Sequence, residues 1–389
     1  MGRPQRKKDK KKPKRTHTKG PKPDKVECEN ELPEEPSEVT KKENSSSKYG
    51  IDQLLDKAQE CIDTFNYELA QKFCQRALEL DPDNLRVLET SGTLLLELGD
   101  SEGAKKCFGR AVELSPDKGH AKYMYLGQLF EGAEAVQCFQ KGIELMTNEL
   151  QQQQQREVSA AFSGSGDEMV SSKDISTAYC SIAEIYMTDC CFEEAAEEKC
   201  RTNIEKAISS DDTNAEAYQL MASFFLSKED REEARKMIEK SVSLWLPKMK
   251  GMENETLLQD PAEVAPINYS ARINASQILI ETESYDLASE ILEGLLDEDE
   301  DVIQVWYLLG WLNYLQGEDY KGNARYYLDK ADKLSKKVSC SDKPMLSHIQ
   351  ELLQELGPGE DEDEEEEGAE MDDFESDSDA EDAVESMES

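Results

Sequence analysis

Small and hydrophobic residues recur at a fixed interval along the middle of the chain. Ala77 and Pro82 are matched 34 residues later by Ala111 and Pro116, and apolar positions three and four residues apart precede each proline. This spacing predicts amphipathic helices. A small residue where two helices cross lets their backbones approach, while a large residue fills the adjacent space. The pattern therefore predicts antiparallel helix pairs that repeat along the chain.

A 34-residue period with two helices per unit is typical of tetratricopeptide repeats. Five weaker copies follow, and the last, VWYLLGWLNYL, carries Trp306, Leu309 and Gly310 in the W-x-x-L-G order of that repeat, which predicts that these three lie in the core. The next stretch, DKPMLSHIQELLQEL, has one apolar face and is expected to cap the array. We predict an all-α, tetratricopeptide-repeat helical solenoid of about seven irregular helix pairs plus a C-terminal capping helix.

The charge pattern divides the chain into three regions. Residues 1–48 form a Lys-rich arm and an acidic linker, residues 49–356 carry the repeats, and residues 357–389 are strongly acidic. Both ends lack apolar periodicity, so we expect a disordered basic N-terminal arm and a disordered acidic C-terminal tail. Within the solenoid, a Gln run followed by a Ser- and Gly-rich stretch predicts a helix extension and then a flexible surface loop, an insertion at about residues 151–173. The fourth unit also has extra residues, which the spacing places inside its second helix.

Composition narrows the class of function. A net charge of −40 over 389 residues favours a basic partner and argues against direct binding to DNA. The apolar runs are shorter than a membrane span, so we expect neither a membrane segment nor a secretory signal. The ten cysteines show no metal-ligand or disulfide spacing, which indicates a reduced intracellular compartment.

Sequence motifs of catalysis are missing from the chain. It contains no Gly-rich phosphate loop, nucleophile elbow, HExxH or CxxC pair. His17, His120 and His348 lie beside no candidate nucleophile or metal cluster in the sequence. We therefore predict that the protein is not an enzyme and uses no cofactor or metal. Scaffolds of this class bind other proteins along the concave surface made by the first helix of each unit.

The first-helix residues near positions two, five, nine and twelve of each unit are expected to face that concave surface. The residues there that suit binding are acids, amides, a methionine and aromatic residues, namely Asp52, Glu89, Glu184, Met187, Glu216, Gln219, Gln277, Tyr307, Trp311 and Tyr314. Acids can pair with Lys or Arg of a client, and aromatic faces can take cations or aliphatic side-chain stems. The alternative is that the acids only keep the surface soluble.

Two further motifs lie in the terminal regions. The segment KKDKKKPKR has the form of a nuclear import signal or of an arm that touches nucleic acid, through Lys7, Lys8, Lys10, Lys11, Lys12, Lys14 and Arg15. A solubilising tail is the alternative reading. In the acidic tail, Ser376 and Ser378 stand among Asp and Glu and are candidate phosphorylation sites.

Two binding functions fit such a scaffold. A co-chaperone that grips the C-terminus of heat-shock proteins would need a clamp of Lys, Asn, Asn, Lys and Arg. The corresponding positions hold other residues, namely Leu55, Gln59, Thr90, Ala121 and Tyr125. The second function is that of a dedicated escort of one basic client. A generic tetratricopeptide scaffold that binds a peptide of another partner remains an alternative to it.

The order of features resembles a known family, the assembly chaperones of the large-subunit ribosomal protein uL4. The resemblance rests on SVSLWLPKM, on RINASQILIETESYDLASEILEGLLDEDEDVIQVWYLLGW, on the Lys-rich start and on the acidic end. It implies that the concave face enfolds the long internal loop of the newly made, basic ribosomal protein, keeps it soluble and escorts it to the nucleus for pre-60S assembly. We further expect a monomer of the cytoplasm and nucleus whose basic N-terminal arm either meets an import receptor or touches RNA or the ribosome. The Gln run and the Ser/Gly stretch have no obvious place in that family's pattern.

Overall fold

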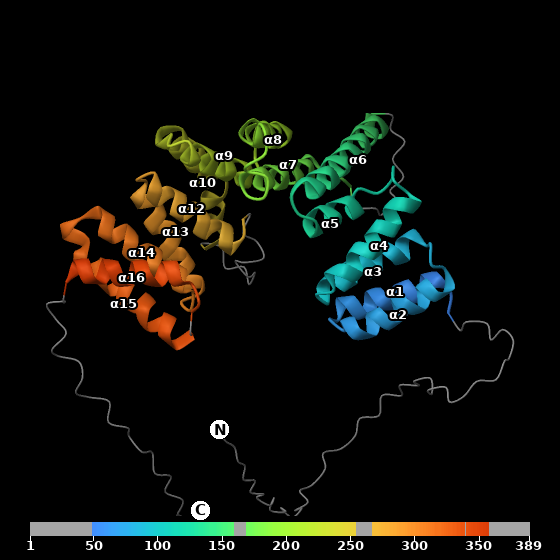
Figure 1. The fold of residues 1–389 in the computed structure, drawn as a ribbon, viewed down its shortest axis with the longest axis horizontal. Helices are drawn as coiled ribbons and strands as arrows, with labels where there is room; N and C mark the ends of the chain where they lie inside the picture. Colours follow the sequence, from blue (N-terminus) through green and yellow to red (C-terminus); the bar gives the residue numbers. More distant parts are fainter. Residues whose placement is uncertain (1–48, 159–168, 254–266, 339, 358–389) are drawn as a thin grey trace, which may run out of the picture. The chain divides into compact units, whose positions relative to one another are not determined.

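The computed structural model describes residues 49–158, 169–253, 267–338 and 340–357, which Figure 1 draws as coloured ribbon. The chain divides into two units, Met1–Lys48 and Tyr49–Ser389, and all the described residues belong to the second. Every long regular element in the described ranges is an α-helix, as the repeat pattern predicted.

The helices follow one another along the chain in seven pairs and a final single helix (Figure 1). In the first three units the pairs are α1 (Ile51–Asp63) with α2 (Tyr67–Leu80), α3 (Leu85–Glu97) with α4 (Ser101–Leu114), and α5 (Ala121–Leu129) with α6 (Gly132–Val158). The fourth and fifth pairs are α7 (Ser172–Met187) with α8 (Ala196–Ser210), and α9 (Ala215–Ser227) with α10 (Arg231–Glu253). The last elements are α12 (Tyr269–Glu281) with α13 (Tyr285–Glu298), α14 (Ile303–Gln316) with α15 (Lys321–Val338), the short 3-10 helix η1 (Glu318–Tyr320) between these two, and α16 (Lys343–Leu356).

Each helix packs against its partner and against the next unit. The first helices α7, α9, α12 and α14 also contact one another in sequence, so one side of this part of the solenoid is built by first helices. The core runs through the repeats rather than forming one centre, and its largest cluster joins α9, α10, α12, α13 and α14 around Trp245, Leu279 and Leu292. Such stacking gives each unit its apolar contacts from its neighbours.

Glycines at the helix crossings explain why the signature positions are small. A Cβ atom added to Gly92 would lie 2.6 Å from Cζ of Phe108, and one added to Gly310 would lie 2.6 Å from Cγ of Leu328. Neither gap can hold another carbon atom without a shift of its neighbours. Leu309 and Gly310 are buried as expected, whereas Trp306 is half-buried and donates its indole N–H to the carbonyl of Glu300 at 2.7 Å.

The turns between the helices of a unit share a local conformation. Phe65, Gly99 and Glu229 adopt positive φ angles of 56°, 77° and 60°, in the left-handed region. The next residue is Asn or Asp, and its side chain caps the second helix, as Asp100 does by accepting the N–H of Gly103 at 2.9 Å. The turn chemistry therefore ends one helix and starts the next within three residues.

The fourth unit departs from that short turn. The repeat spacing predicted five extra residues inside its second helix, but α7 ends at Met187 and α8 begins at Ala196, so the extra length forms the turn. Asp189 in this turn accepts the backbone N–H of Gly132, at 3.2 Å, from the preceding unit. The Gln run at residues 151–155 continues helix α6, and residues 159–168 lie outside the described ranges.

Candidate functional site

Two neighbouring hollows open on the side of the first helices in the middle of the solenoid. The first has a volume of about 560 Å³ and is lined from α5, α6, α7 and α9. The second, of about 380 Å³, is lined from α7, α9 and α12. Glu184, Leu220 and Ser223 line both, so we treat the two hollows as one surface, which we call the central groove.

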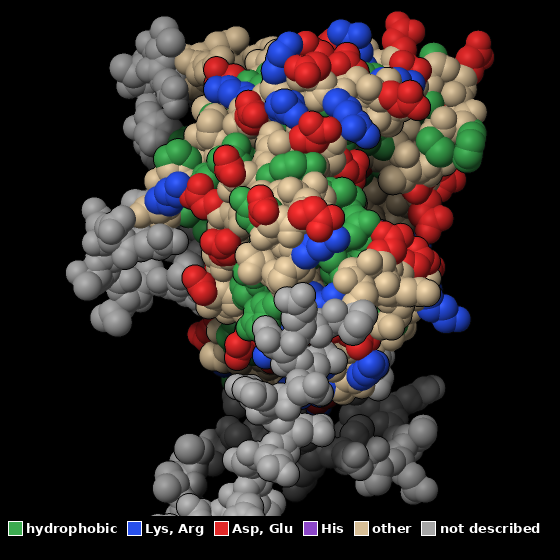
Figure 2. Space-filling view, turned by 90° about the vertical axis from the view of Figure 1, so that its left-hand side faces the viewer, with side chains coloured by type: hydrophobic (Ala, Val, Ile, Leu, Met, Phe, Trp, Pro, Cys, Tyr) green, Lys and Arg blue, Asp and Glu red, His purple; other side chains and the backbone are tan. Residues whose placement is uncertain are grey.

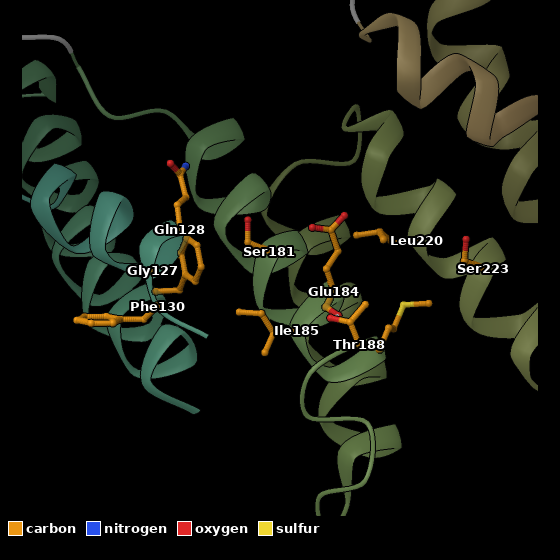
Figure 3. A pocket seen from close by; sticks show the side chains of 11 residues that line it. Gly127, Gln128, Phe130, Ser181, Glu184, Ile185, Thr188, Leu220 and Ser223 are labelled. Atoms are coloured by element: carbon orange, nitrogen blue, oxygen red, sulfur yellow. The ribbon is translucent and has the colours of Figure 1, made fainter. Parts of the chain in front are cut away.

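The central groove combines carboxylates, amides and apolar side chains. Figure 3 shows Glu184 on α7 and Leu220 on α9 projecting toward one another, with Gln128 of α5 on the other side of Ser181. Around the second hollow the polar residues are Glu184, Glu216, Gln219, Ser223, Asn274, Gln277 and Glu281. This set can accept hydrogen bonds from a cationic side chain and can also pair with a peptide backbone.

Glu184 and Glu216 form the electrostatic centre of the groove. Both side chains are reached by solvent, yet the surrounding protein removes part of their water, and this raises the pKa of each carboxyl above its ordinary value. The charge of Glu216 raises the pKa of Glu184 further, while Lys173 opposes the rise at Glu216. Neither carboxylate makes an ion pair within the described residues.

Acids of the first two units have partners within the chain. Asp52 accepts from Nη1 of Arg86 at 3.1 Å, and Glu89 lies 4.0 Å from the ammonium of Lys122. Lys122 is only 1% exposed, and burial lowers its pKa while Glu89 opposes that shift. The predicted acidic positions therefore fall into two kinds, those paired by the next unit and those without an ion pair among the described residues.

The amides and the methionine among the predicted residues differ in exposure. Gln219 is buried and donates its side-chain N–H to the carbonyl of Ala271 at 3.1 Å, which links α9 to α12. Gln277 is exposed and donates to Glu281 at 3.3 Å. Met187 is half-buried at the edge of the first hollow. All three line the central groove, so spacing placed them on the same surface as Glu184 and Glu216.

The predicted aromatic residues lie elsewhere, against the capping helix. The hydroxyl of Tyr307 is 2.7 Å from Nδ1 of His348 on α16, and the ring of Trp311 meets the same imidazole edge-on at 6.1 Å between centroids. Tyr314 donates its hydroxyl to Glu355 of the same helix. All three side chains are half-buried, and they do not line the central groove. Their role toward a client stays a prediction.

The remaining predicted sites lie outside the described residues. These are the basic segment from Lys7 to Arg15 and the candidate phosphorylation sites Ser376 and Ser378. Among the residues that the structure describes, no group of three or more His, Cys, Asp or Glu side chains is arranged to hold a metal ion. In the same ranges, none of the helices has the length and apolar character needed to cross a membrane.

Known proteins resemble this chain in both sequence and structure. The model of the tetratricopeptide repeat matches residues 54–84, 85–118 and 215–244. A protein of Schizosaccharomyces pombe named "Probable assembly chaperone of rpl4" is 31% identical over 290 residues, which make up 70% of this chain and 80% of that protein. This chain belongs to the same family. The resemblance that the sequence motifs carried is thereby confirmed.

Other members of the family of rpl4 assembly chaperones support the assignment. A protein of Emericella nidulans with the same name is 28% identical over 281 residues, or 68% of this chain and 65% of that protein. The solved structure named "Assembly Chaperone of RpL4 (Acl4) (Residues 1-338)" shares 26% sequence identity with a TM-score of 0.61, and the match covers 71% of this chain and all of that one. The family consists of chaperones built on a repeat scaffold, so this member is not an enzyme, and the predicted solenoid is confirmed.

Proposed function

We propose that this protein is an assembly chaperone of the ribosomal protein uL4, the counterpart of rpl4, and that it holds a basic segment of that client in the central groove. The segment is the long internal loop of the newly made ribosomal protein. The chaperone keeps this segment soluble and accompanies it to the nucleus, where it enters the pre-60S particle. The relatives' names support the client, and the geometry of the groove supports the mode of binding.

The observation that carries the proposal is the pair of open carboxylates. Glu184 and Glu216 lie on adjacent first helices, line the same hollow and have no cation of their own within ion-pair distance in the described part of the chain. Partial desolvation raises the pKa of both carboxyls, and the charge of Glu216 adds to the rise at Glu184, so their ionised forms are disfavoured. A Lys or Arg side chain of a client would relieve both penalties, because it supplies the missing positive charge.

The neighbouring side chains complete a surface for an extended basic peptide. Leu220 and Met187 offer apolar contact to the aliphatic stem of a lysine or arginine. Asn274 and Gln277 bring amide groups that can pair with the peptide backbone. A segment rich in Lys and Arg cannot fold alone because of its own repulsion, and an acidic host lowers that repulsion.

The charge of the solenoid also suggests how the client is released from the chaperone. In residues 49–356 the chain has 58 Asp and Glu against 30 Lys and Arg, a net charge of −28. The association with a basic client is therefore sensitive to salt and to competing polyanions. Ribosomal RNA presents a dense row of phosphates, so it can replace the carboxylates of the groove as the counter-charge of the client.

A charge-removal experiment tests the groove. The variant with Glu184→Gln and Glu216→Gln keeps the size and polarity of both side chains, and we expect its dissociation constant for purified uL4 to rise about 10- to 100-fold, since two charge-assisted contacts are lost. The matched control carries Asp52→Asn and Glu89→Gln, whose carboxylates are already paired within the chain. We expect it to bind within about twofold of the wild type.

Binding is measured by calorimetry at two salt concentrations, with circular dichroism to show that both variants stay helical. Equal affinities of the wild type and the groove variant would place the client elsewhere. A pull-down followed by mass spectrometry checks the identity of the client. Recovery of heat-shock proteins through their C-termini, without uL4, would favour the co-chaperone alternative and contradict the proposal.

A further inference from the structure

Helix α15 carries a strip of positive charge in an otherwise acidic solenoid. Its 18 residues include six Lys and Arg but only two Asp. The side chains of Tyr326, Lys330, Lys333 and Lys337 are all exposed and lie four, three and four residues apart, so they form one continuous row along the helix. We call this row the lysine stripe. Figure 2, which views this end of the solenoid, shows basic side chains in blue among the acids in red.

The cations of the lysine stripe are not neutralised by the solenoid itself. Lys330 lies over the ring of Tyr326, 5.6 Å from its centroid. Lys333 and Lys337 make no ion pair within the described residues, whereas Lys336 beside them is paired with Asp332 at 2.6 Å. Three ammonium groups on one exposed row repel each other. Such a row is stabilised by an anionic chain laid along it.

The end of α16, which the acidic tail follows in the sequence, is hydrogen-bonded to this helix. Arg325 of α15 donates from Nη2 to the backbone carbonyl of Leu356, the last residue of α16, at 2.7 Å. The first acidic residue of the tail, Glu360, follows four residues later, and residues 360–367 are all Asp or Glu. Four extended residues span up to about 14 Å. The run of eight acids therefore starts within reach of the stripe.

The geometry of the helix places the stripe close to that exit point. Successive residues of an α-helix are rotated by about 100° around its axis. The centre of the row from Tyr326 to Lys337 therefore lies about a quarter to a third of a turn around α15 from Arg325. Lys330 and Lys337 are about 10 Å apart along the axis at 1.5 Å per residue. Eight extended acidic residues span up to about 29 Å and so exceed the stripe in length.

We propose that the acidic tail of residues 357–389 docks on the lysine stripe of α15. The tail holds 18 Asp and Glu and no Lys or Arg, so it has the charge that the stripe needs. Docking fixes a polyanion next to the last unit and neutralises a basic surface that would otherwise attract nucleic-acid phosphates. The first eight acids provide most of the contact, because they are the densest and nearest.

Two measurements on the full chain test this docking. A zero-length carbodiimide crosslinker joins carboxylates to amines in direct contact, and we expect tail peptides to be joined to Lys330, Lys333 or Lys337. The second measurement is the rate at which a glutamate-specific protease cleaves within residues 360–367. In the variant K330Q/K333Q/K337Q we expect cleavage about three- to tenfold faster, because three surface ion pairs of modest energy are lost. About 1 M salt should have the same effect on the wild type.

The matched control carries Lys72→Gln, Lys106→Gln and Lys240→Gln, which removes three exposed lysines from the second helices α2, α4 and α10. Its tail should be cleaved at the wild-type rate. Crosslinks of the tail chiefly to other lysines, or an unchanged cleavage rate in the stripe variant, would overturn the proposal. A third outcome would also overturn it, namely that the wild type binds RNA, the stripe variant does not, and the tail of the variant is cleaved at the wild-type rate. The stripe would then be a nucleic-acid surface. Neither readout involves the client, so the result is independent of the proposed chaperone function.

Discussion

Glu184 is the side chain at which the proposed client binding and the stability of the fold oppose each other most directly. In the folded protein, partial desolvation and the nearby charge of Glu216 raise the pKa of its carboxyl. In the unfolded chain the same group ionises at its ordinary pKa. The folded state is therefore favoured when Glu184 is protonated, and this stability is lost as the pH rises through the raised pKa. At neutral pH the ionised carboxylate destabilises the free protein.

We accordingly predict that Glu184→Gln raises the melting temperature at about pH 7.5, although it weakens client binding. The gain should shrink toward about pH 4, where the wild-type carboxyl is protonated as well. Glu89→Gln serves as the control and should lower the melting temperature, because the buried ammonium of Lys122 loses its counter-charge. Thermal unfolding followed by circular dichroism measures both. A lower melting temperature for Glu184→Gln at pH 7.5 would contradict this account.

The repeat spacing was enough to find the acids on the side of the first helices, but it could not tell which of these acids form ion pairs within the chain. Asp52 and Glu216 are each the second residue of a first helix, and only the structure shows that Arg86 neutralises Asp52. A signal did exist in the sequence, since Arg86 lies 34 residues after Asp52 and Lys122 lies 33 residues after Glu89. One unit after Glu184, with the five extra residues of the fourth turn included, the chain has Ser223, so no cation arrives there.

At the scale of elements, one ion pair with a buried guanidinium ties α12 to α13. Arg272 is 2% exposed, and its guanidinium donates to both carboxylate oxygens of Glu298, with Nη2 2.8 Å from Oε2. The ring of Tyr269 lies against the same guanidinium, 5.4 Å from centroid to Cζ. The pair joins the first helix of the sixth unit to the end of its second helix, next to the central groove.

Removing one member of this pair should be costly. We predict that Glu298→Ala lowers the free energy of unfolding by about 3 kcal/mol, because a buried guanidinium is left without its counter-charge. Replacing both residues, Arg272→Met with Glu298→Met, should recover most of that loss, since no charge remains to be desolvated. The midpoint of urea unfolding reports both changes. A double variant as unstable as the single one would show that packing, rather than charge, determines the effect.

The sequence predicted the helices and the faces that their residues occupy better than it predicted which helices contact one another. The helix pairs and the apolar face of α16 were predicted from spacing alone. Spacing could not show that Tyr307, Trp311 and Tyr314 meet α16, because helix phase gives the face of a residue but not the element that covers that face. The long turn of the fourth unit escaped prediction for a related reason, since Ala195 takes a left-handed φ of 58° that nothing in its residue type favours.

At the scale of the whole molecule, the charges of the sequence are strongly segregated. Residues 1–25 hold 12 Lys and Arg against two Asp, whereas the repeats and the tail are acidic. The proposed groove would account for a basic client, but it does not account for a basic arm on the same chain. The segment KKDKKKPKR matches the basic clusters that import receptors recognise. We therefore propose that this arm brings the chaperone and its client to the nucleus.

We predict that nuclear accumulation depends on the arm and not on the groove. In a fluorescent fusion, replacing Lys7, Lys8, Lys10, Lys11, Lys12, Lys14 and Arg15 with Gln should shift the protein toward the cytoplasm, because the receptor binds through positive charge. The groove variant with Glu184→Gln and Glu216→Gln is the control and should still accumulate in the nucleus if the chaperone supplies its own signal. Loss of accumulation in the groove variant alone would mean that the client carries the signal for both proteins. An arm variant that accumulates like the wild type would leave contact with RNA or the ribosome as the role of the arm.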